Sequence, residues 1–186
     1  MRIIDDVMPA VMQDQLHEMV TTPEFNWSFL KDVTFSPKDT LANTMGKPKM
    51  PGLSHLAMNE YQQRTPVLQI MSSMILCMSE KAEQNPGNLY RVKFGMYLPL
   101  KDAPLHNNIH TDMKCPHTVC LYYVNDADGD TFFFDKNREI IDRITPKKGR
   151  MVVFDGLVHH ASSMPSKDYR ISLNLGYVDP QYTKKV

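Results

Sequence analysis

The chain has 186 residues, enough for one domain with a sizeable hydrophobic core. Its 21 basic and 21 acidic side chains give a formal net charge of zero. Nucleic acids and anionic membrane surfaces usually select a basic excess, so neither is an expected partner. The three cysteines, Cys77, Cys115 and Cys120, form no CxxC pair, and no stretch is typical of a signal peptide or a membrane span. We therefore expect a cytoplasmic protein without disulfides.

The first half of the sequence, residues 1–88, is predicted to consist of helices and loops. Residues 11–20 and 65–84 have apolar side chains at helical spacing, and the second segment is followed by an Asn-Pro-Gly stop. The aromatic segment 25–30 is expected to pack on the main body. Residues 31–58 contain three prolines and show little periodicity, which predicts a long ordered loop and a candidate lid.

From Leu89 onward the apolar pattern changes to a period of two, which is typical of strands. Turn sequences rich in Gly, Pro and Asp separate the predicted strands. The strands are expected at 89–98, 117–125, 131–134, 139–144, 150–154 and 169–178. Several short strands predict a mainly β sandwich or barrel, with the helical half covering one sheet. We expect a single domain over residues 1–186, with the β core at 89–180.

Two histidine motifs in the second half are candidate metal ligands. His110 and Asp112 lie two positions apart, so on an extended segment they project from the same face. The adjacent pair His159 and His160 follows the predicted strand 150–154 and offers a second imidazole. Two histidines and one carboxylate form the facial triad that leaves positions of iron(II) open. Either motif alone is also compatible with structural histidines that bond to backbone carbonyls.

Arg170 lies in the last predicted strand. Alternation places it on one face with Ser172 and Asn174, while the opposite face is apolar. A buried arginine needs an anion, either a bound carboxylate or an internal aspartate.

The order of these motifs, His-x-Asp, then a histidine and then an arginine ten residues later, resembles a known family. It is that of the iron(II)- and 2-oxoglutarate-dependent oxygenases, in their prolyl-4-hydroxylase-like branch. The resemblance is carried by IHTDM, VCLYYVNDADGDTFFF, PKKGRMVVFDGLVHHASSMP and YRISLNL. It implies a double-stranded β-helix, or jelly roll, with the N-terminal helices packed on one sheet.

The resemblance also implies a metal-binding set. His110, Asp112 and His160 would bind Fe(II). The motif places the ligand six residues after Phe154, which selects His160 and leaves His159 pointing away, toward the surface or a supporting partner.

Further residues are implied to bind the cosubstrate. Arg170 would pair with the carboxylate of 2-oxoglutarate that is remote from the metal. Ser172 and Tyr123 would assist at the same carboxylate, and Leu121 would pack against the cosubstrate chain.

The implied activity uses Fe(II), 2-oxoglutarate and O2 to hydroxylate a peptidyl residue, including proline, or a small molecule, with release of succinate and CO2. Gly176 stands where nucleic-acid demethylases of the wider superfamily carry a second arginine, which disfavours that branch. Loops 31–58 and 99–109 would determine the substrate and are candidate lids.

Two other functions stay open on the sequence. One is a jelly-roll binding module without catalysis, and the other is a cupin-like metal-dependent hydrolase or isomerase that uses the same triad. Arg170 distinguishes the oxygenase from both of these functions, because only the oxygenase requires this arginine to bind 2-oxoglutarate.

Overall fold

The structure, a computed structural model, describes residues 1–33 and 50–182. Its helices are α1 (Ala10–Thr21), α2 (Val67–Ile70) and α3 (Ser72–Ala82), with 3-10 turns η2 (Pro86–Asn88) and η3 (Pro180–Tyr182). Its strands are β1 (Arg2–Ile4), β2 (Ser28–Leu30), β3 (Gly52–Asn59), β4 (Gln62–Gln63), β5 (Leu89–Tyr97), β6 (Thr118–Tyr123), β7 (Thr131–Phe134), β8 (Ile140–Ile144), β9 (Met151–Asp155), β10 (His159–Ser162) and β11 (Arg170–Tyr177). None of these helices is long and apolar enough to cross a bilayer.

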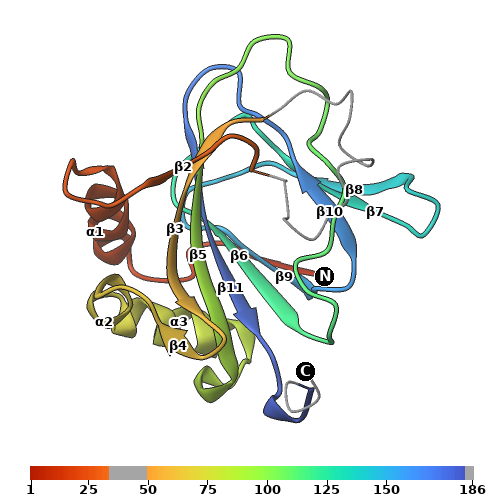
Figure 1. Cartoon of the computed structure of the whole chain (residues 1–186). Coiled ribbons are helices and arrows are strands. Elements are labelled where there is room, and N and C mark those ends of the chain that lie inside the picture. Colours follow the sequence, from red (N-terminus) through yellow and green to blue (C-terminus); the bar gives the residue numbers. More distant parts are fainter. Residues whose placement is uncertain (34–49, 183–186) are drawn as a thin grey trace.

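The strands form two antiparallel sheets (Figure 1). The larger sheet has eight strands in the order β1-β9-β6-β11-β5-β3-β2, with β4 paired to β3, and the smaller sheet has the order β10-β7-β8. The helices pack on one side of the large sheet, and the small sheet lies on the other side. The predicted mainly β fold with helices on one sheet is therefore confirmed.

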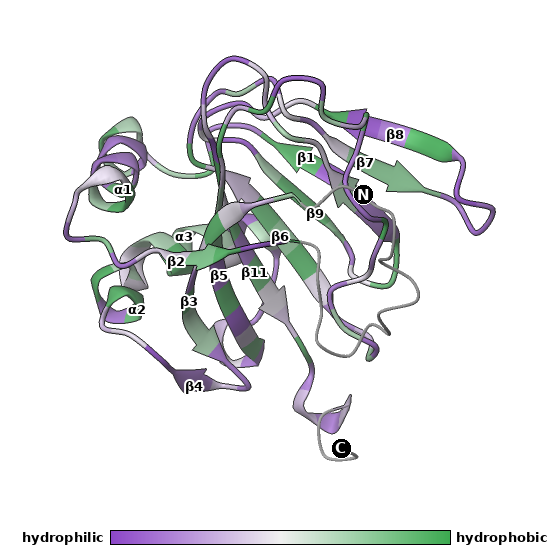
Figure 2. Ribbon diagram, turned by 45° about the horizontal axis from the view of Figure 1, so that its top comes forward, coloured by the Kyte–Doolittle hydropathy of each residue, from purple (hydrophilic) through white to green (hydrophobic). Residues whose placement is uncertain are grey.

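The face of the large sheet that meets the helices is apolar. Ile171, Leu173 and Leu175 of β11 are fully buried there, in one cluster with Leu16 of α1 and Met78 of α3. Hydrophobic residues alternate with hydrophilic ones along β5 and β11 of this sheet (Figure 2). The alternation buries the apolar half against the helices and leaves the other half facing the small sheet.

A second core joins the two sheets. It consists of residues from β6, β7, β8 and β9, namely Val119, Leu121, Tyr123, Phe133, Ile144, Val152 and Phe154. Cys120 and Tyr122 of β6 point to the helix side and are also fully buried. Because β6 is buried on both faces, its sequence is a continuous apolar run rather than an alternating one.

The prediction of helices and loops for residues 1–88 is wrong for four short strands, β1 to β4. The largest error is β3 (Gly52–Asn59), which takes up the end of the predicted loop 31–58 and extends one residue beyond it. Its register against β5 shifts between Leu56 and Met58, so the two halves of the strand do not share one alternating pattern. Residues 34–49 of the predicted lid lie outside the described residues.

The second predicted helix, 65–84, is divided in two. Met71 departs from helical geometry with φ −90° and ψ 4°, and separates α2 from α3. Met71 is fully buried, so the bend brings α3 onto the sheet core. The six strands predicted after Leu89 are confirmed as β5 to β9 and β11, whereas β10 was not predicted.

Leu173→Ala tests the helix-side core. Leu173 has no solvent exposure, so its truncation should lower the free energy of unfolding by about 2–5 kcal/mol. Urea denaturation followed by circular dichroism would measure this. The matched control is Leu76→Ala in α3, which is 56% exposed and should change stability by less than about 1 kcal/mol. Equal losses in the two variants would contradict the assigned core.

Candidate metal centre

Backbone hydrogen bonds hold His110 and His160 opposite each other. The amide of each residue donates to the carbonyl oxygen of the other, both at 3.0 Å, which adds the His110 segment to the edge of β10. The two imidazole centroids are 4.7 Å apart. Two histidines far apart in sequence are thus fixed side by side by main-chain geometry.

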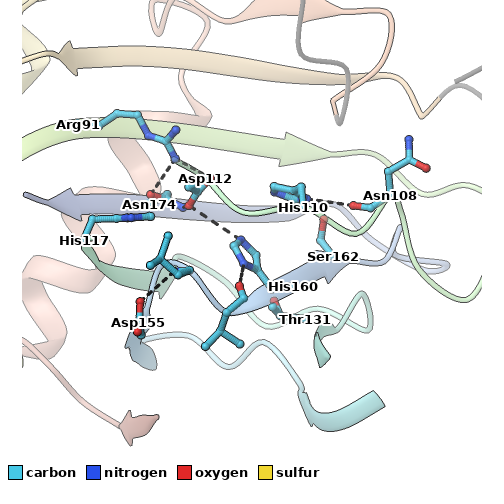
Figure 3. A network of polar contacts seen from close by, with 12 residues as sticks. Arg91, Asn108, His110, Asp112, His117, Thr131, Asp155, His160, Ser162 and Asn174 are labelled. Carbon is cyan, nitrogen blue, oxygen red and sulfur yellow. Dashed lines mark hydrogen bonds and ion pairs between the residues drawn. The ribbon is translucent and has the colours of Figure 1, made fainter. Parts of the chain in front are cut away.

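Both imidazoles are oriented by their Nδ1 atoms. His110 Nδ1 donates to the carbonyl oxygen of Asn108, and His160 Nδ1 donates to that of Val158, each at 3.0 Å (Figure 3). A carbonyl can only accept, so the proton of each neutral ring is on Nδ1 and the Nε2 lone pair is free. Metal-binding histidines in proteins typically show this second hydrogen bond.

Asp112 completes the cluster from the loop between β5 and β6. Arg91 Nη2 lies 2.8 Å from Asp112 Oδ1, and Asn174 Nδ2 donates to Oδ2 at 2.8 Å. Asp112 Oδ2 is 3.9 Å from His160 Nε2. The ligand atoms of His110, Asp112 and His160 all lie within 4.8 Å of one another, close enough to surround one ion.

The electrostatics keep Asp112 and His160 in the forms that bind metal. Burial raises the pKa of Asp112, but the charge of Arg91 and the neighbouring histidines outweigh it and hold the pKa well below its usual range. Burial, with His110 beside it, lowers the pKa of His160 to about 4. At neutral pH the site therefore presents a carboxylate and an uncharged His160 imidazole.

Arg170 forms a second polar centre in the same cavity. It is 2% exposed, and its Nη2 donates to Thr131 Oγ1 at 2.9 Å. The guanidinium carbon lies 5.3 Å from the ring centre of Tyr97 and 5.5 Å from that of Tyr123. Arg170 Nε has no hydrogen-bond partner, and no carboxylate among the described residues lies within ion-pairing distance. The alternative of an internal aspartate is thus not found in the part of the chain that the structure describes.

The hydroxyl of Tyr123 adds a hydrogen-bond donor beside Arg170. It donates to Thr131 Oγ1 at 2.8 Å, the atom that Arg170 also contacts. Burial raises the pKa of Tyr123, so the hydroxyl keeps its proton at neutral pH. A guanidinium and two hydroxyls that converge in a buried place suit a carboxylate.

One cavity of about 100 Å³ connects the two centres. His110, Asp112 and His160 line it together with Arg170. The remaining predicted residues, Leu121 and Ser172, line it as well, whereas Tyr123 contributes through Thr131. The structure therefore brings all of the predicted site residues into one region.

His159 takes no part in this cavity. It is exposed, whereas its neighbour His160 is buried, because alternate residues of β10 point to opposite faces. The sequence-based preference for His160 over His159 agrees with this geometry.

One face of β5 and the residue Thr131 belong to the site although the sequence did not predict them there. Arg91, Lys93, Gly95 and Tyr97 all line the cavity. Their spacing of two was visible in the sequence, but only the position of β5 beside β11 shows that this face belongs to the site. Burial lowers the pKa of Lys93.

No protein-family model and no curated protein matches the sequence. Solved structures do match, including a Pseudomonas putida prolyl-4-hydroxylase with a TM-score of 0.61 and 15% identity, covering 96% of this chain and 92% of that one. A Trichoplax adhaerens prolyl hydroxylase, in complex with a hypoxia inducible factor peptide fragment, has a TM-score of 0.63 and 13% identity, over 98% and 85% of the two chains. The epimerase SnoN, in complex with Fe3+, alpha ketoglutarate and nogalamycin RO, has a TM-score of 0.62 and 12% identity, over 95% and 78%.

The chain has the fold of these oxygenase-type enzymes. The predicted jelly roll is thereby confirmed. At this level of identity the likeness concerns the fold, and the chemistry has to be argued from the site itself.

The metal-free protein should lose stability as the pH falls from about 6.5 to 4. His160 binds a proton near pH 6.5 when unfolded but only near pH 4 when folded, so acid favours the unfolded chain in this interval. The contribution is at most about 3 kcal/mol, because each pKa unit corresponds to roughly 1.4 kcal/mol. Urea unfolding at several pH values would measure the slope of the free energy of unfolding against pH. His160→Gln, which cannot take up this proton, should show a flatter profile, and an unchanged slope would contradict the assignment.

Proposed function

We propose that the protein is an Fe(II)- and 2-oxoglutarate-dependent dioxygenase that hydroxylates its substrate. The observation that carries this proposal is the pairing, within one cavity, of a His-Asp-His cluster and a buried arginine that has no carboxylate partner among the described residues. A hydrolase or isomerase would need the first feature but not the second. The match to oxygenase folds supports the same interpretation.

The three proposed ligands fit iron(II) chemically. Two imidazole nitrogens and one carboxylate oxygen are the donor set of the facial triad, and both Nε2 atoms are free because Nδ1 carries the proton. Arg91 holds Asp112 Oδ1, and Oδ2, which accepts from Asn174, keeps a second lone pair and lies 3.9 Å from His160 Nε2. The catalytic residues would be His110, Asp112 and His160.

The proposed cosubstrate fits the second centre. Arg170 would bind the remote carboxylate of 2-oxoglutarate through its free Nε–H, with the Thr131 hydroxyl as a further donor that Tyr123 assists by its hydrogen bond to Thr131 Oγ1. Leu121 and Ser172 line the same cavity and would contact the cosubstrate chain. When bound, the iron and 2-oxoglutarate would supply the oxidising chemistry with O2, releasing succinate and CO2.

The protein's own contribution would be orientation and exclusion of water. Phe154 packs edge-on against the His160 ring at 5.1 Å, and Tyr97 covers the Arg170 guanidinium while accepting a hydrogen bond from Ser162 Oγ at 3.0 Å. These contacts fix the two centres relative to each other before any substrate binds, which is how a site holds reacting groups in position.

The substrate is proposed to be a peptidyl residue, including proline, or a small molecule. The structural neighbours include one enzyme bound to a peptide fragment and one bound to nogalamycin RO. We propose no nucleic-acid or membrane partner, since the chain has no net charge. The three free cysteines support the proposal of a reducing compartment such as the cytoplasm.

Arg170→Met should weaken 2-oxoglutarate binding by at least about tenfold, since it removes a charged hydrogen bond in a buried place. Fe(II) binding should stay close to that of the wild type, because Arg170 contacts none of the three proposed ligands. Anaerobic titration of the apoprotein with Fe(II) and 2-oxoglutarate, followed by the visible charge-transfer band, measures both steps.

Two histidine variants serve as controls for this titration. His160→Ala should abolish the band, whereas His159→Ala should retain it because His159 is exposed. Absence of the band in the wild type would refute the proposed function. A band that is unaffected by Arg170→Met would place the cosubstrate elsewhere.

Loop 99–109 is proposed to move only in its middle. Leu100 N donates to Pro165 O at 2.9 Å, and Asn107 N donates to Ser162 O at 2.8 Å, so both ends are tied to the body. In hydrogen exchange, the amides of Leu100 and Asn107 should be more protected than those of 101–106, and addition of Fe(II) and 2-oxoglutarate should slow exchange in 101–106. Exchange that is indifferent to these additions would exclude a lid role.

A further inference from the structure

The side chains that line the cavity carry more positive charge than the proposed cosubstrate would neutralise. Its described lining includes three cationic side chains, Arg91, Lys93 and Arg170, and one carboxylate, that of Asp112. A divalent metal and doubly charged 2-oxoglutarate cancel each other, so they leave this excess unchanged. Burying a cation without a partner is costly, which indicates that a further anion binds here.

Two of the three cations already have partners. Arg91 pairs with Asp112 at 2.8 Å and also donates to Asn174 Oδ1 at 3.3 Å. Arg170 is the proposed partner of the remote carboxylate of 2-oxoglutarate. The ammonium group of Lys93 forms no ion pair or hydrogen bond within the part of the chain that the structure describes, although its side chain is largely enclosed.

Lys93 lies at the metal end of the cavity rather than at the Arg170 end. In the pairing of β5 with β11, Lys93 is opposite Asn174, the residue that donates to Asp112, whereas Tyr97 is opposite Arg170. Four residues along a strand separate Lys93 from Tyr97, roughly 13 Å. Lys93 therefore lies at a strand position nearer to the proposed metal ligands than to Arg170.

We propose that Lys93 binds a carboxylate of the primary substrate and places that substrate next to the metal. The substrate would then be an acidic small molecule or a peptide with an acidic residue near the oxidised position. This inference rests on the proposed function. The metal-bound end of 2-oxoglutarate also carries a carboxylate, so the experiment has to separate the two sources.

The first arm of the test measures the cosubstrate. Fe(II) and 2-oxoglutarate are titrated anaerobically into the wild type, Lys93→Met, Lys93→Arg and the surface control Lys81→Met, with the charge-transfer band as readout. If Lys93 serves the substrate, Lys93→Met should bind 2-oxoglutarate within about threefold of the wild type. A loss of about tenfold or more, the size of one charged hydrogen bond, would assign Lys93 to the cosubstrate and overturn the inference.

The second arm measures the substrate carboxylate with a simple probe. The complex with Fe(II) and saturating 2-oxoglutarate is titrated anaerobically with propionate, and separately with neutral propionamide. Propionate should shift the band in the wild type, Lys93→Arg and Lys81→Met, independently of the 2-oxoglutarate concentration. Its affinity should fall at least about tenfold in Lys93→Met, whereas propionamide should act equally on all variants.

The outcomes separate this inference from the proposed function. A normal band with no propionate effect, or with one that Lys93→Met leaves unchanged, would overturn the role of Lys93 and leave the oxygenase proposal intact. Absence of the band in the wild type would overturn both. Near-ultraviolet circular dichroism identifies any variant that has not folded. Lys93→Arg, which keeps the charge at the same position, is then compared with the wild type for propionate binding.

Discussion

The pairing of Arg91 with Asp112 is the interaction on which the rest of the site depends. A carboxylate in the interior needs compensation for its lost hydration, and here a guanidinium and an amide supply it at 2.8 Å each. Arg91 belongs to β5 and Asn174 to β11, so two neighbouring strands support a residue of the loop between β5 and β6. Without these two contacts, an ionised carboxylate in the interior would be destabilised by its lost hydration.

The two faces of the large sheet have different roles. One face packs against the helices and stabilises the fold, and the other lines the cavity. On β11, Ile171, Leu173 and Leu175 point to the helices, while Arg170, Ser172 and Asn174 point into the cavity. β5 repeats the division with Val92 and Phe94 on one side. Because side chains alternate along a strand, a slip of one residue would exchange the two sets, so the apolar core also enforces the register of the polar site.

The β core could be predicted from the sequence because its patterns are local, whereas most of the candidate site was predicted because the order of its motifs resembles that of a known family. His110 and Asp112 share a face through their spacing of two, and the alternation around Arg170 is uninterrupted. The N-terminal strands could not be predicted in the same way. β1 and β2 have three residues each, too few to show a period, and the bulge in β3 breaks its pattern. The roles of Arg91, Lys93 and Thr131 arise only from tertiary contacts that no spacing reveals.

The backbone bridge between His110 and His160 couples the site to the assembly of the whole β core. One histidine precedes β6 and the other lies in β10, so the bridge joins two segments that are separated in the chain by four strands, β6 to β9. An ion that binds both rings would bind the folded chain and not the unfolded one, and would add to its stability by mass action. Occupancy of this centre by an ion would then depend on the integrity of the fold, so that unfolding of the β core would release the ion.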